Sequence, residues 1–477
     1  MTDLPGGWAG ATMTEVSSDS GYGTSAKCGY EELGIGVLRI PNIQKGSIDL
    51  ADLKRAPTSL EVNDHLRLRA DDLLLVRTNG SQDLIGRCAP VTQDLECSFA
   101  SYLIRFRMRS EVVDTRFVSW MLSSPTWRQR LEAAAASSAG QYNLSLRTLG
   151  PLPVVVPPLA EQERIVAAIE EAFSKLDAGE AGLRTLRQLL KRMRDAILAA
   201  AVTGHLVPQD PTDTPASKLL ADLGVEAIVT GAVTALPDGW AWAALGSISE
   251  SVRNGIFVSR PPETPPGVPI LRIGAVRRLE LDLTDVRFAR VDVADPAVAR
   301  ALLLSGDLLF TRYNGNPAFV GACAVVPEID SPLLHPDKLI RVVVNRAVAE
   351  PTFVATAAAA GASRSFIEGV TKTTAGQAGI SGSDLRLVPI PLAPVEEQRR
   401  IVSEVERQFS FLDACERAVD TGLARAAATR RSVLKAAFEG RLVPQEPSDE
   451  PASVSLQRIR AERAAAPKAA RRSRRTA

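Results

Sequence analysis

Apolar residues recur at alternating spacings of four and three over residues 158–203, which is the pattern of a coiled-coil helix. Pro158 suits the first helical turn, and Gly204 followed by Pro208 provides a stop. At about 1.5 Å per residue, such a helix would extend about 69 Å. The residues predicted to form its apolar seam are Ile165, Ile169, Ala172, Leu176, Gly179, Leu183, Leu186, Leu190, Met193, Ile197 and Ala200.

This helical stretch occurs twice. Residues 158–166 are matched by residues 394–402, a shift of 236, and the match holds without a gap for roughly sixty residues. The second copy would make a poor coiled coil alone, so we expect the two helices to pair with each other. Its seam positions that carry polar or small residues are Gln408, Cys415, Gly422 and Thr429.

Short apolar runs bounded by turn residues precede each helix and predict strands. Short sequence motifs from the segment before the first helix recur in the same order before the second helix. For example, Leu38-Arg39-Ile40 recurs as Leu271-Arg272-Ile273. We therefore predict an α+β chain in which two mixed α/β domains are joined by two long helices, with a pseudo-two-fold internal repeat. The predicted segments are a first variable domain at 1–150, a first helix at 151–205, a linker at 206–236, a second variable domain at 237–388, a second helix at 389–441, and a linker with a basic C-terminal tail at 442–477.

The order of the segments sets the direction of the helix pair. The first helix leaves the first domain and must reach the second, whereas the second helix starts at the second domain. If the helices pair, they run antiparallel, and the two equivalent halves are related by a pseudo-two-fold axis. Both helices join the same two domains, so their length would fix the distance between them.

The composition is that of a globular chain, since 45% of its 477 residues are hydrophobic and the mean hydropathy is near zero. No apolar run of about eighteen residues occurs, so we expect no membrane partner. The five cysteines are odd in number and scattered. They predict a reduced, cytoplasmic location and no metal site.

The formal net charge of +1 combines a basic tail with an acidic body. Residues 455–477 hold eight Lys or Arg and one acid, a charge of +7, which leaves −6 for the rest. We expect this tail to be disordered, either solvated or in contact with nucleic acid. Any DNA-binding surface in the acidic body must be local.

Motifs of catalysis are missing from the sequence. It contains no Gly-Lys dipeptide of a Walker loop and no Gly-x-Gly-x-x-Gly, and its Pro-Pro pairs lack the flanking residues of an amino-methyltransferase motif. His65, His205 and His335 are too few and too scattered for a triad or a metal site. We therefore expect no catalytic residue, no metal and no cofactor bound by this chain.

The candidate binding residues lie in predicted polar loops. Arg77 and Asn79 flank a turn in the first domain, as Arg312 and Asn314 do in the second. An Asn-Gly pair is also a hairpin signal, so a structural role is the alternative. Arg can form two parallel bonds to guanine and Asn or Gln can do so to adenine, although phosphate contacts are commoner. The candidate DNA-binding residues are Tyr22, Thr24, Lys27, Arg77, Asn79, Gln141, Asn143, Arg253, Asn254, Arg312, Asn314, Lys372 and Gln377.

The repeated motifs give the chain a family resemblance. The helix starts Pro-Pro-Leu-Ala-Glu-Gln-Glu-Arg-Ile-Val and Ala-Pro-Val-Glu-Glu-Gln-Arg-Arg-Ile-Val are followed by the helix ends Gly-His-Leu-Val-Pro and Gly-Arg-Leu-Val-Pro. Together with residues 21–27, they resemble the specificity subunits of type I restriction–modification systems, over nearly all of residues 1–450. The second half departs from the Gly-Tyr-Gly-Thr-Ser pattern of the first and has Arg253-Asn254-Gly255-Ile256-Phe257 instead.

The resemblance implies a non-catalytic subunit in which each variable domain is a target recognition domain. Each domain would read one half of a bipartite, asymmetric site in double-stranded DNA. The antiparallel helices would space the domains and dock two modification subunits, which bind S-adenosylmethionine and methylate adenine. Restriction subunits would add translocation and cleavage driven by ATP and Mg²⁺. The alternatives are a coiled-coil scaffold that binds only protein and a self-contained DNA-modifying enzyme.

Overall fold

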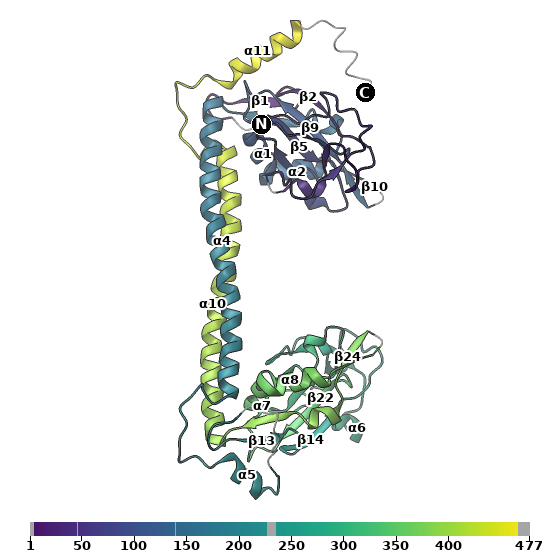
Figure 1. Cartoon of the computed structure of the whole chain (residues 1–477), viewed down its shortest axis with the longest axis vertical. Coiled ribbons are helices and arrows are strands. Elements are labelled where there is room, and N and C mark those ends of the chain that lie inside the picture. Colours follow the sequence, from purple (N-terminus) through teal and green to yellow (C-terminus); the bar gives the residue numbers. More distant parts are fainter. Residues whose placement is uncertain (1–3, 45, 139, 227–234, 375, 466–477) are drawn as a thin grey trace. The chain divides into compact units, whose positions relative to one another are not determined.

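The computed structural model describes residues 4–44, 46–138, 140–226, 235–374 and 376–465, and the chain forms two compact units (Figure 1). The first unit combines Met1–Leu183 with Thr421–Ala477, and the second unit is Arg184–Asp420. Two long helices, α4 (Leu159–Val202) and α10 (Val395–Phe438), each contribute to both units. None of the helices in the described ranges is long and apolar enough to cross a bilayer.

The first unit contains an antiparallel four-stranded sheet of order β2-β9-β5-β7. Strand β5 (Asp72–Val76) is entirely buried, as an apolar run between turn signals predicts. Helix α1 (Thr115–Ser123) begins at the Asp114 cap and buries its apolar face in the core of this unit. The other elements are β1 (Ala9–Thr12), β2 (Ser17–Tyr22), β3 (Gly36–Leu38), β4 (Lys54–Arg55), β6 (Thr78–Asn79), β7 (Cys88–Pro90), β8 (Cys97–Phe99), β9 (Leu103–Met108), α2 (Pro125–Ala134), β10 (Ala136–Ser138), β11 (Gln141–Asn143), α3 (Leu146–Leu149), β12 (Pro153–Val156), α11 (Ala452–Ala465) and the short 3-10 turns Ile40–Asn42 and Gln82–Leu84.

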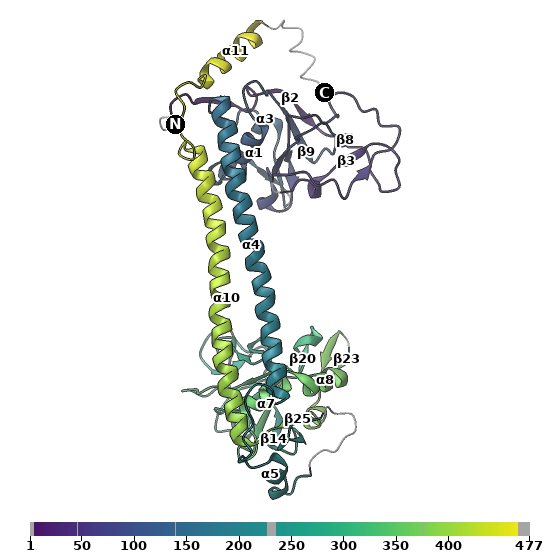
Figure 2. The ribbon, with the colours of Figure 1, turned by 60° about the vertical axis from the view of Figure 1, so that its left-hand side comes forward.

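The second unit repeats this plan with the sheet order β14-β22-β19-β21. In both units a further three-stranded sheet of short strands is formed, β10-β11-β6 in the first and β20-β24-β23 in the second. Strands β20 and β23 of the second are labelled in Figure 2. The elements are α5 (Ala216–Asp222), β13 (Ala241–Ala244), β14 (Ser249–Asn254), β15 (Val268–Leu271), β16 (Val276–Arg277), β17 (Glu280–Leu281), β18 (Val286–Ala289), α6 (Pro296–Ala299), β19 (Leu308–Thr311), β20 (Tyr313–Asn314), β21 (Cys323–Val325), β22 (Leu339–Val344), α7 (Pro351–Ala358), α8 (Gly361–Val370), β23 (Lys372–Thr374), β24 (Gln377–Gly379), α9 (Gly382–Arg386), β25 (Pro389–Leu392) and the 3-10 turns Ile273–Ala275 and Pro317–Phe319.

Helices α4 and α10 pack together within each unit. In the first unit, Arg430 of α10 bonds Asp177 and Glu180 of α4, and Gly422 lies against Leu183. Residue numbers therefore rise along one helix as they fall along the other, which confirms the predicted antiparallel pair. Arg430 also stacks over the Phe173 ring at 4.9 Å.

The same contacts recur in the second unit at positions shifted by 236. Arg194 bonds Asp413 and Glu416 and stacks over Phe409 at 4.9 Å. The predicted apolar seam is wrong in part, because Leu186 and Met193 are 39% and 40% exposed. In this stretch Arg187 of α4 pairs with Asp420 of α10, and Arg194 pairs with Asp413 and Glu416.

The repeated motif at each helix start is a structural joint. The buried Gln162 side chain donates from Nε2 to the carbonyls of Val112 and Pro157, and its Oε1 accepts from the Asp114 backbone N–H. Gln398, the equivalent residue of α10, makes the same set of bonds in the second unit. Its partners are the carbonyls of Val348 and Ala393 and the backbone N–H of Glu350. The Glu-Gln pairs therefore anchor the helices to the domains.

The C-terminal segment is part of the first unit. Residues 452–465 form α11, whose Leu456 and Ile459 are buried in the core of that unit. The expectation of a disordered tail is therefore wrong for these residues, because apolar contacts outweigh their basic composition. The Ala452 N–H donates to the Gly7 carbonyl, as Ala216 donates to Gly239 in the second unit. The rest of the predicted tail, 466–477, lies outside the described residues.

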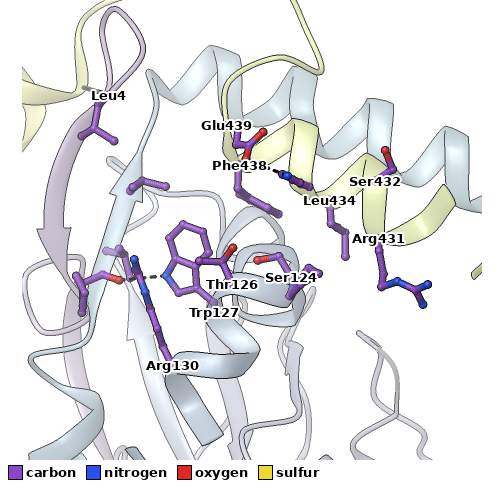
Figure 3. A pocket seen from close by; sticks show the side chains of 15 residues that line it. Leu4, Ser124, Thr126, Trp127, Arg130, Arg431, Ser432, Leu434, Phe438 and Glu439 are labelled. Carbon is purple, nitrogen blue, oxygen red and sulfur yellow. Dashed lines mark hydrogen bonds and ion pairs between the residues drawn. The ribbon is translucent and has the colours of Figure 1, made fainter. Parts of the chain in front are cut away.

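A cavity of about 460 Å³ lies in the first unit, where α2, β12 and α10 meet (Figure 3). Trp127 and Phe438 line it, and the Trp127 Nε1–H donates to the Pro153 carbonyl at 3.1 Å. Arg130 stacks over the Trp127 ring at 5.0 Å. None of the candidate DNA-binding residues lines this cavity, so it is not part of the surface that the sequence predicts to bind DNA.

Candidate DNA-binding surfaces

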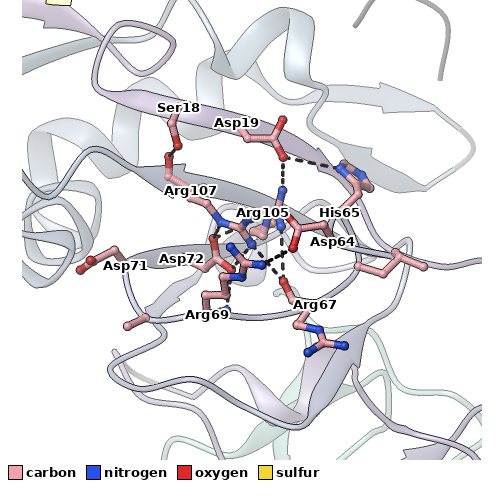
Figure 4. Close-up of polar contacts among 12 residues, drawn as sticks. Ser18, Asp19, Asp64, His65, Arg67, Arg69, Asp71, Asp72, Arg105 and Arg107 are labelled. Carbon is pink, nitrogen blue, oxygen red and sulfur yellow. Dashed lines mark hydrogen bonds and ion pairs between the residues drawn. The ribbon is translucent and has the colours of Figure 1, made fainter. Parts of the chain in front are cut away.

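A buried arginine holds the central strands of the first unit in place. Arg105 on β9 is fully buried and pairs with Asp19 of β2 and, at 3.8 Å, with Asp72 of β5 (Figure 4). Burial lowers the pKa of the Arg105 guanidinium, and the two carboxylates oppose this shift. Arg107 adds two bonds to the Asp72 carboxylate at 2.9 and 3.1 Å. This network fixes β2, which leads directly to the first candidate residues.

The end of β2 presents three of the candidates. Tyr22 points its hydroxyl at the backbone N–H of Leu146, from which it accepts a bond of 3.0 Å. Thr24 is 9% exposed and its hydroxyl accepts from the Ala26 N–H, so it holds the turn. Lys27 is exposed. The structure therefore leaves Lys27 accessible and gives Tyr22 and Thr24 partners within the fold.

The small sheet β10-β11-β6 brings together candidates that are more than sixty residues apart in sequence. Asn79 of β6 is opposite Tyr142 of β11, and the Thr78 hydroxyl donates to Asn143 Oδ1 at 2.7 Å. Asn79 Oδ1 accepts from the Ser81 N–H, which is a turn bond. Gln141 at the start of β11 is exposed.

The sheet β20-β24-β23 is the counterpart in the second unit. It places Asn314 opposite Ala378, next to Gln377, and Lys372 opposite Gly379. Lys372 and Gln377 are exposed, while Asn314 Oδ1 accepts from the Asn316 N–H at 2.9 Å. In both units, segments predicted as polar loops are instead hairpins. The reason is a glycine in the left-handed region at each turn, and these glycines are Gly140 (φ 76°) and Gly376 (φ 79°).

Arg253 and Asn254 end β14, the counterpart of β2. Strand register puts Asn254 opposite Ile340 as Tyr22 is opposite Ile104, so Asn254 takes the place of Tyr22. Both Arg253 and Asn254 are exposed. The sequence of this segment thus differs between the units although its backbone is paired in the same way.

The glycine that follows each strand, Gly23 after β2 and Gly255 after β14, explains why the backbone pairing is the same in both units. A Cβ atom on Gly23 would lie 2.1 Å from the Phe99 carbonyl oxygen, and one on Gly255 would lie 2.0 Å from the His335 carbonyl oxygen. Both strands therefore approach a neighbouring backbone so closely that only glycine fits. His335 itself is buried, which lowers its pKa to about 4, so it is neutral and structural near pH 7.

Arg77 and Arg312 are engaged with the protein. Arg77 Nε donates to the Leu144 carbonyl at 3.1 Å, Nη1 donates to the Ser101 carbonyl, and the guanidinium stacks over Tyr22 at 4.6 Å. Arg312 stacks over Tyr313 at 4.7 Å. The structure thus brings Arg77 and Tyr22 together, which their separation in sequence does not indicate.

Three exposed side chains near these surfaces were not predicted. Tyr102 is 56% exposed and its carbonyl accepts from the Arg77 N–H; Lys338 is exposed and its carbonyl accepts in the same way from Arg312. Phe257, just beyond Gly255, is 76% exposed. The signal for the first two was their place directly before a repeated Leu-Ile-Arg sequence, which is residues 103–105 in the first unit and 339–341 in the second. For Phe257 the signal was an aromatic residue within a polar segment.

These surfaces offer amide, ammonium and guanidinium groups that can bond base edges and phosphates. Their charged and amide groups come from strand ends and hairpins that the sheets hold in place. Within the described ranges, no group of three or more His, Cys, Asp and Glu residues could hold a metal ion. The arrangement is suited to recognition by hydrogen bonding.

Comparison with known proteins gives consistent results. No protein-family model matches the chain. The chain is 31% identical over 475 residues to the type I restriction enzyme EcoKI specificity subunit of Escherichia coli (strain K12), with 97% of each chain covered. It is 26% identical over 473 residues to the StySPI specificity subunit of Salmonella potsdam, covering 97% of this chain and 96% of that one.

The fold also has a solved relative. A structure described as the basis of complex assembly and conformational transition of the type I R-M system matches with a TM-score of 0.63 and 18% identity. The match covers 92% of this chain and 100% of that chain. The two-helix, two-domain architecture is therefore a known one.

Proposed function

Because the chain belongs to the specificity subunits of type I restriction enzymes, we propose that it recognises a specific sequence of double-stranded DNA for a methyltransferase and endonuclease complex. The chain is the recognition component and carries no catalytic centre of its own. The observation that carries this proposal is the contrast between a repeated framework and different exposed side chains. The buried joints, such as Gln162 and Gln398, match residue for residue.

Each unit would read one half of a bipartite site. The exposed residue directly before the central strand, called the corner residue here, is Tyr102 before β9 in the first unit and Lys338 before β22 in the second. Different donors and acceptors select different bases. The two half-sites would therefore differ, and the whole site would be asymmetric.

The helices would dock the partner subunits. An apolar stripe on α4 stays uncovered in the second unit, where Leu186, Leu189 and Met193 are 39%, 50% and 40% exposed. Their spacing of three and four places them on one helix face. This stripe supports docking of modification subunits. Those subunits would bind S-adenosylmethionine, and restriction subunits would bring ATP and Mg²⁺.

A domain replacement tests the proposal. Residues 1–150 are replaced by the equivalent domain of a relative, and methylated sites are mapped in a genome that carries the complete system. One half-site should change while the other half-site and the spacer remain, and replacing residues 237–388 should change the opposite half. A change in both halves, or in neither, would contradict modular recognition.

A second experiment separates recognition from catalysis. The purified chain is incubated with DNA and radiolabelled S-adenosylmethionine, with the assembled complex as the positive control. Label should enter DNA only with the complex. Methyl transfer by the chain alone would favour the self-contained enzyme instead.

A further inference from the structure

The Arg77 side chain connects four segments of the first unit. Its guanidinium covers the Tyr22 ring of β2, and it bonds carbonyls at Ser101 and Leu144. Its own backbone N–H donates to the Tyr102 carbonyl, and its carbonyl accepts from the Leu144 N–H. The end of β2, the corner at residues 101–102, and the strands of the small sheet therefore share one side chain.

The donors of Arg77 are partly used by these bonds. A guanidinium can present a pair of parallel N–H groups in two ways, from Nε with Nη2 or from Nη1 with Nη2. Arg77 donates to carbonyls from both Nε and Nη1. The single Nε–H is therefore engaged, as is one of the two N–H groups of Nη1, so the Nε/Nη2 pair is not available to guanine while these bonds hold.

Arg312 is held by fewer bonds than Arg77. Its Nη1 donates to the Asp337 carbonyl at 3.3 Å, and its buried Nε has no hydrogen-bond partner. The ring beneath it belongs to the next residue, Tyr313 of β20, and Asn254 occupies the place of Tyr22. The second unit has thus kept the stacked arginine while the aromatic partner comes from a different strand.

We infer that Arg77 and Arg312 are positioning residues, each of which holds the small sheet of its unit in register with the neighbouring loops and contacts no base. This inference rests on the proposed DNA recognition. Exposed neighbours make the contacts, and the arginines set where those neighbours lie. Loss of an arginine should therefore weaken recognition at several adjacent base pairs of one half-site.

The test uses Arg77→Lys and Arg312→Lys in the assembled methyltransferase complex. Affinity for the cognate duplex, for duplexes with single base-pair changes and for unrelated DNA is measured over a range of salt concentrations. Lysine keeps the positive charge, but its ammonium group lacks the planar set of N–H donors and the flat stacking surface of a guanidinium. Each variant should lose about tenfold in cognate affinity, the scale of one charged hydrogen bond. Discrimination between base pairs should fall at several positions of one half-site. Arg77→Lys should affect the half-site read by the first unit, and Arg312→Lys the half-site read by the second.

The dependence on salt distinguishes the other roles. A phosphate contact would be kept by lysine, and Arg77→Ala would reduce the slope of log K against log salt by about 0.9. A positioning residue leaves that slope unchanged in both variants. A reduced slope, a loss confined to a single base pair, or wild-type discrimination in Arg77→Lys would each overturn the inference.

Tyr22→Leu provides an independent variant. It removes the ring beneath Arg77 and leaves the charge in place. It should reduce discrimination at the same several base pairs of the same half-site. Combining it with Arg77→Lys should give little further loss of discrimination, because both substitutions disrupt the same stacked pair. Additive losses would contradict a shared positioning role. If the wild-type complex showed no sequence preference at all, the proposed function would fail instead.

Discussion

The two units of this chain keep the same backbone contacts while changing the side chains that make them. In the first unit Trp127 donates to the Pro153 carbonyl, and in the second Ser363 donates to the equivalent carbonyl of Pro389. A large aromatic residue and a small hydroxyl thus satisfy the same acceptor. What is preserved is the position of the backbone carbonyl, which accepts a side-chain hydrogen bond in both units.

The units differ more strongly in their buried charge. Arg105 is fully buried against Asp19 and Asp72, whereas its counterpart Arg341 is 15% exposed and pairs with Asp307. Ser251 stands where the first unit has Asp19. The first unit therefore depends on one buried arginine more heavily than the second does.

The largest effect should come from Arg105→Ala. It leaves Asp72 and Asp19 without this buried partner and should cost about 3–5 kcal/mol of the unfolding free energy. Arg341→Ala is the matched variant and should cost less. Chemical unfolding gives the total loss, and hydrogen–deuterium exchange locates it in one unit. An equal or greater loss for Arg341→Ala would remove the difference between the units.

The next effect concerns the shared joint. Gln162→Leu should leave the Val112 and Pro157 carbonyls and the Asp114 N–H buried without partners, costing about 2–3 kcal/mol. Gln398→Leu should cost the same within error, because its three bonds are the repeat of those of Gln162. The same unfolding measurement compares them. Clearly unequal losses would show that the two helix starts are not equivalent.

A smaller effect is expected where the strands approach a neighbouring backbone. Gly23→Ala and Gly255→Ala should each destabilise their unit by about 1–2 kcal/mol, because the added methyl meets a carbonyl that cannot move freely. Gly369→Ala is the control, since nothing lies within 4 Å of a Cβ there and alanine favours the helix. The midpoint temperature of thermal unfolding should fall for the first two variants and should stay the same or rise for the control. An unchanged midpoint for Gly23→Ala would show that the neighbouring backbone segments can separate.

The smallest effect depends on pH. Burial raises the pKa of Glu161 and Glu397 above 4.5, and the Trp8 N–H bond partly offsets this for Glu161. A raised carboxyl pKa contributes stability below the unfolded value, and that contribution is lost as pH rises through the folded value. Glu161→Gln and Glu397→Gln should therefore stabilise the protein at pH 7 by up to about 1 kcal/mol. The gain should disappear near pH 4, and a gain of equal size at both pH values would exclude this origin.

The sequence predicted the scaffold well because its signals are local or repeated. The motif at Pro158 and its copy at Pro394 marked two helices, and the poor seam of the second copy indicated that they pair. The seam failed at Leu186 and Met193 because periodicity does not show which side chains face them. Ion pairs from Arg187 and Arg194 to acidic residues of α10 join the helices along this stretch, and they depend on the register between the helices.

The candidate surfaces were harder to predict because their contacts join distant segments. Arg77 and Asn79 were found from a turn signal, but the stacking of Arg77 on Tyr22 involves positions 55 residues apart. For α11, the basic composition concealed a local signal, the spacing of three between Leu456 and Ile459. Charge counts describe what is exposed, whereas three buried residues, Ala452, Leu456 and Ile459, dock this helix.

The division of the chain between the units has a consequence for its synthesis. The core of the first unit includes Leu434, Phe438 and Leu456, which leave the ribosome only after the whole second unit has been made. At about 5–20 residues per second, translation of Arg184–Asp420 takes roughly 10–50 s. The second unit is continuous, so its last residue is made before the residues of α10 and α11 that belong to the core of the first unit. The N-terminal domain, although made first, must wait through this interval for part of its core.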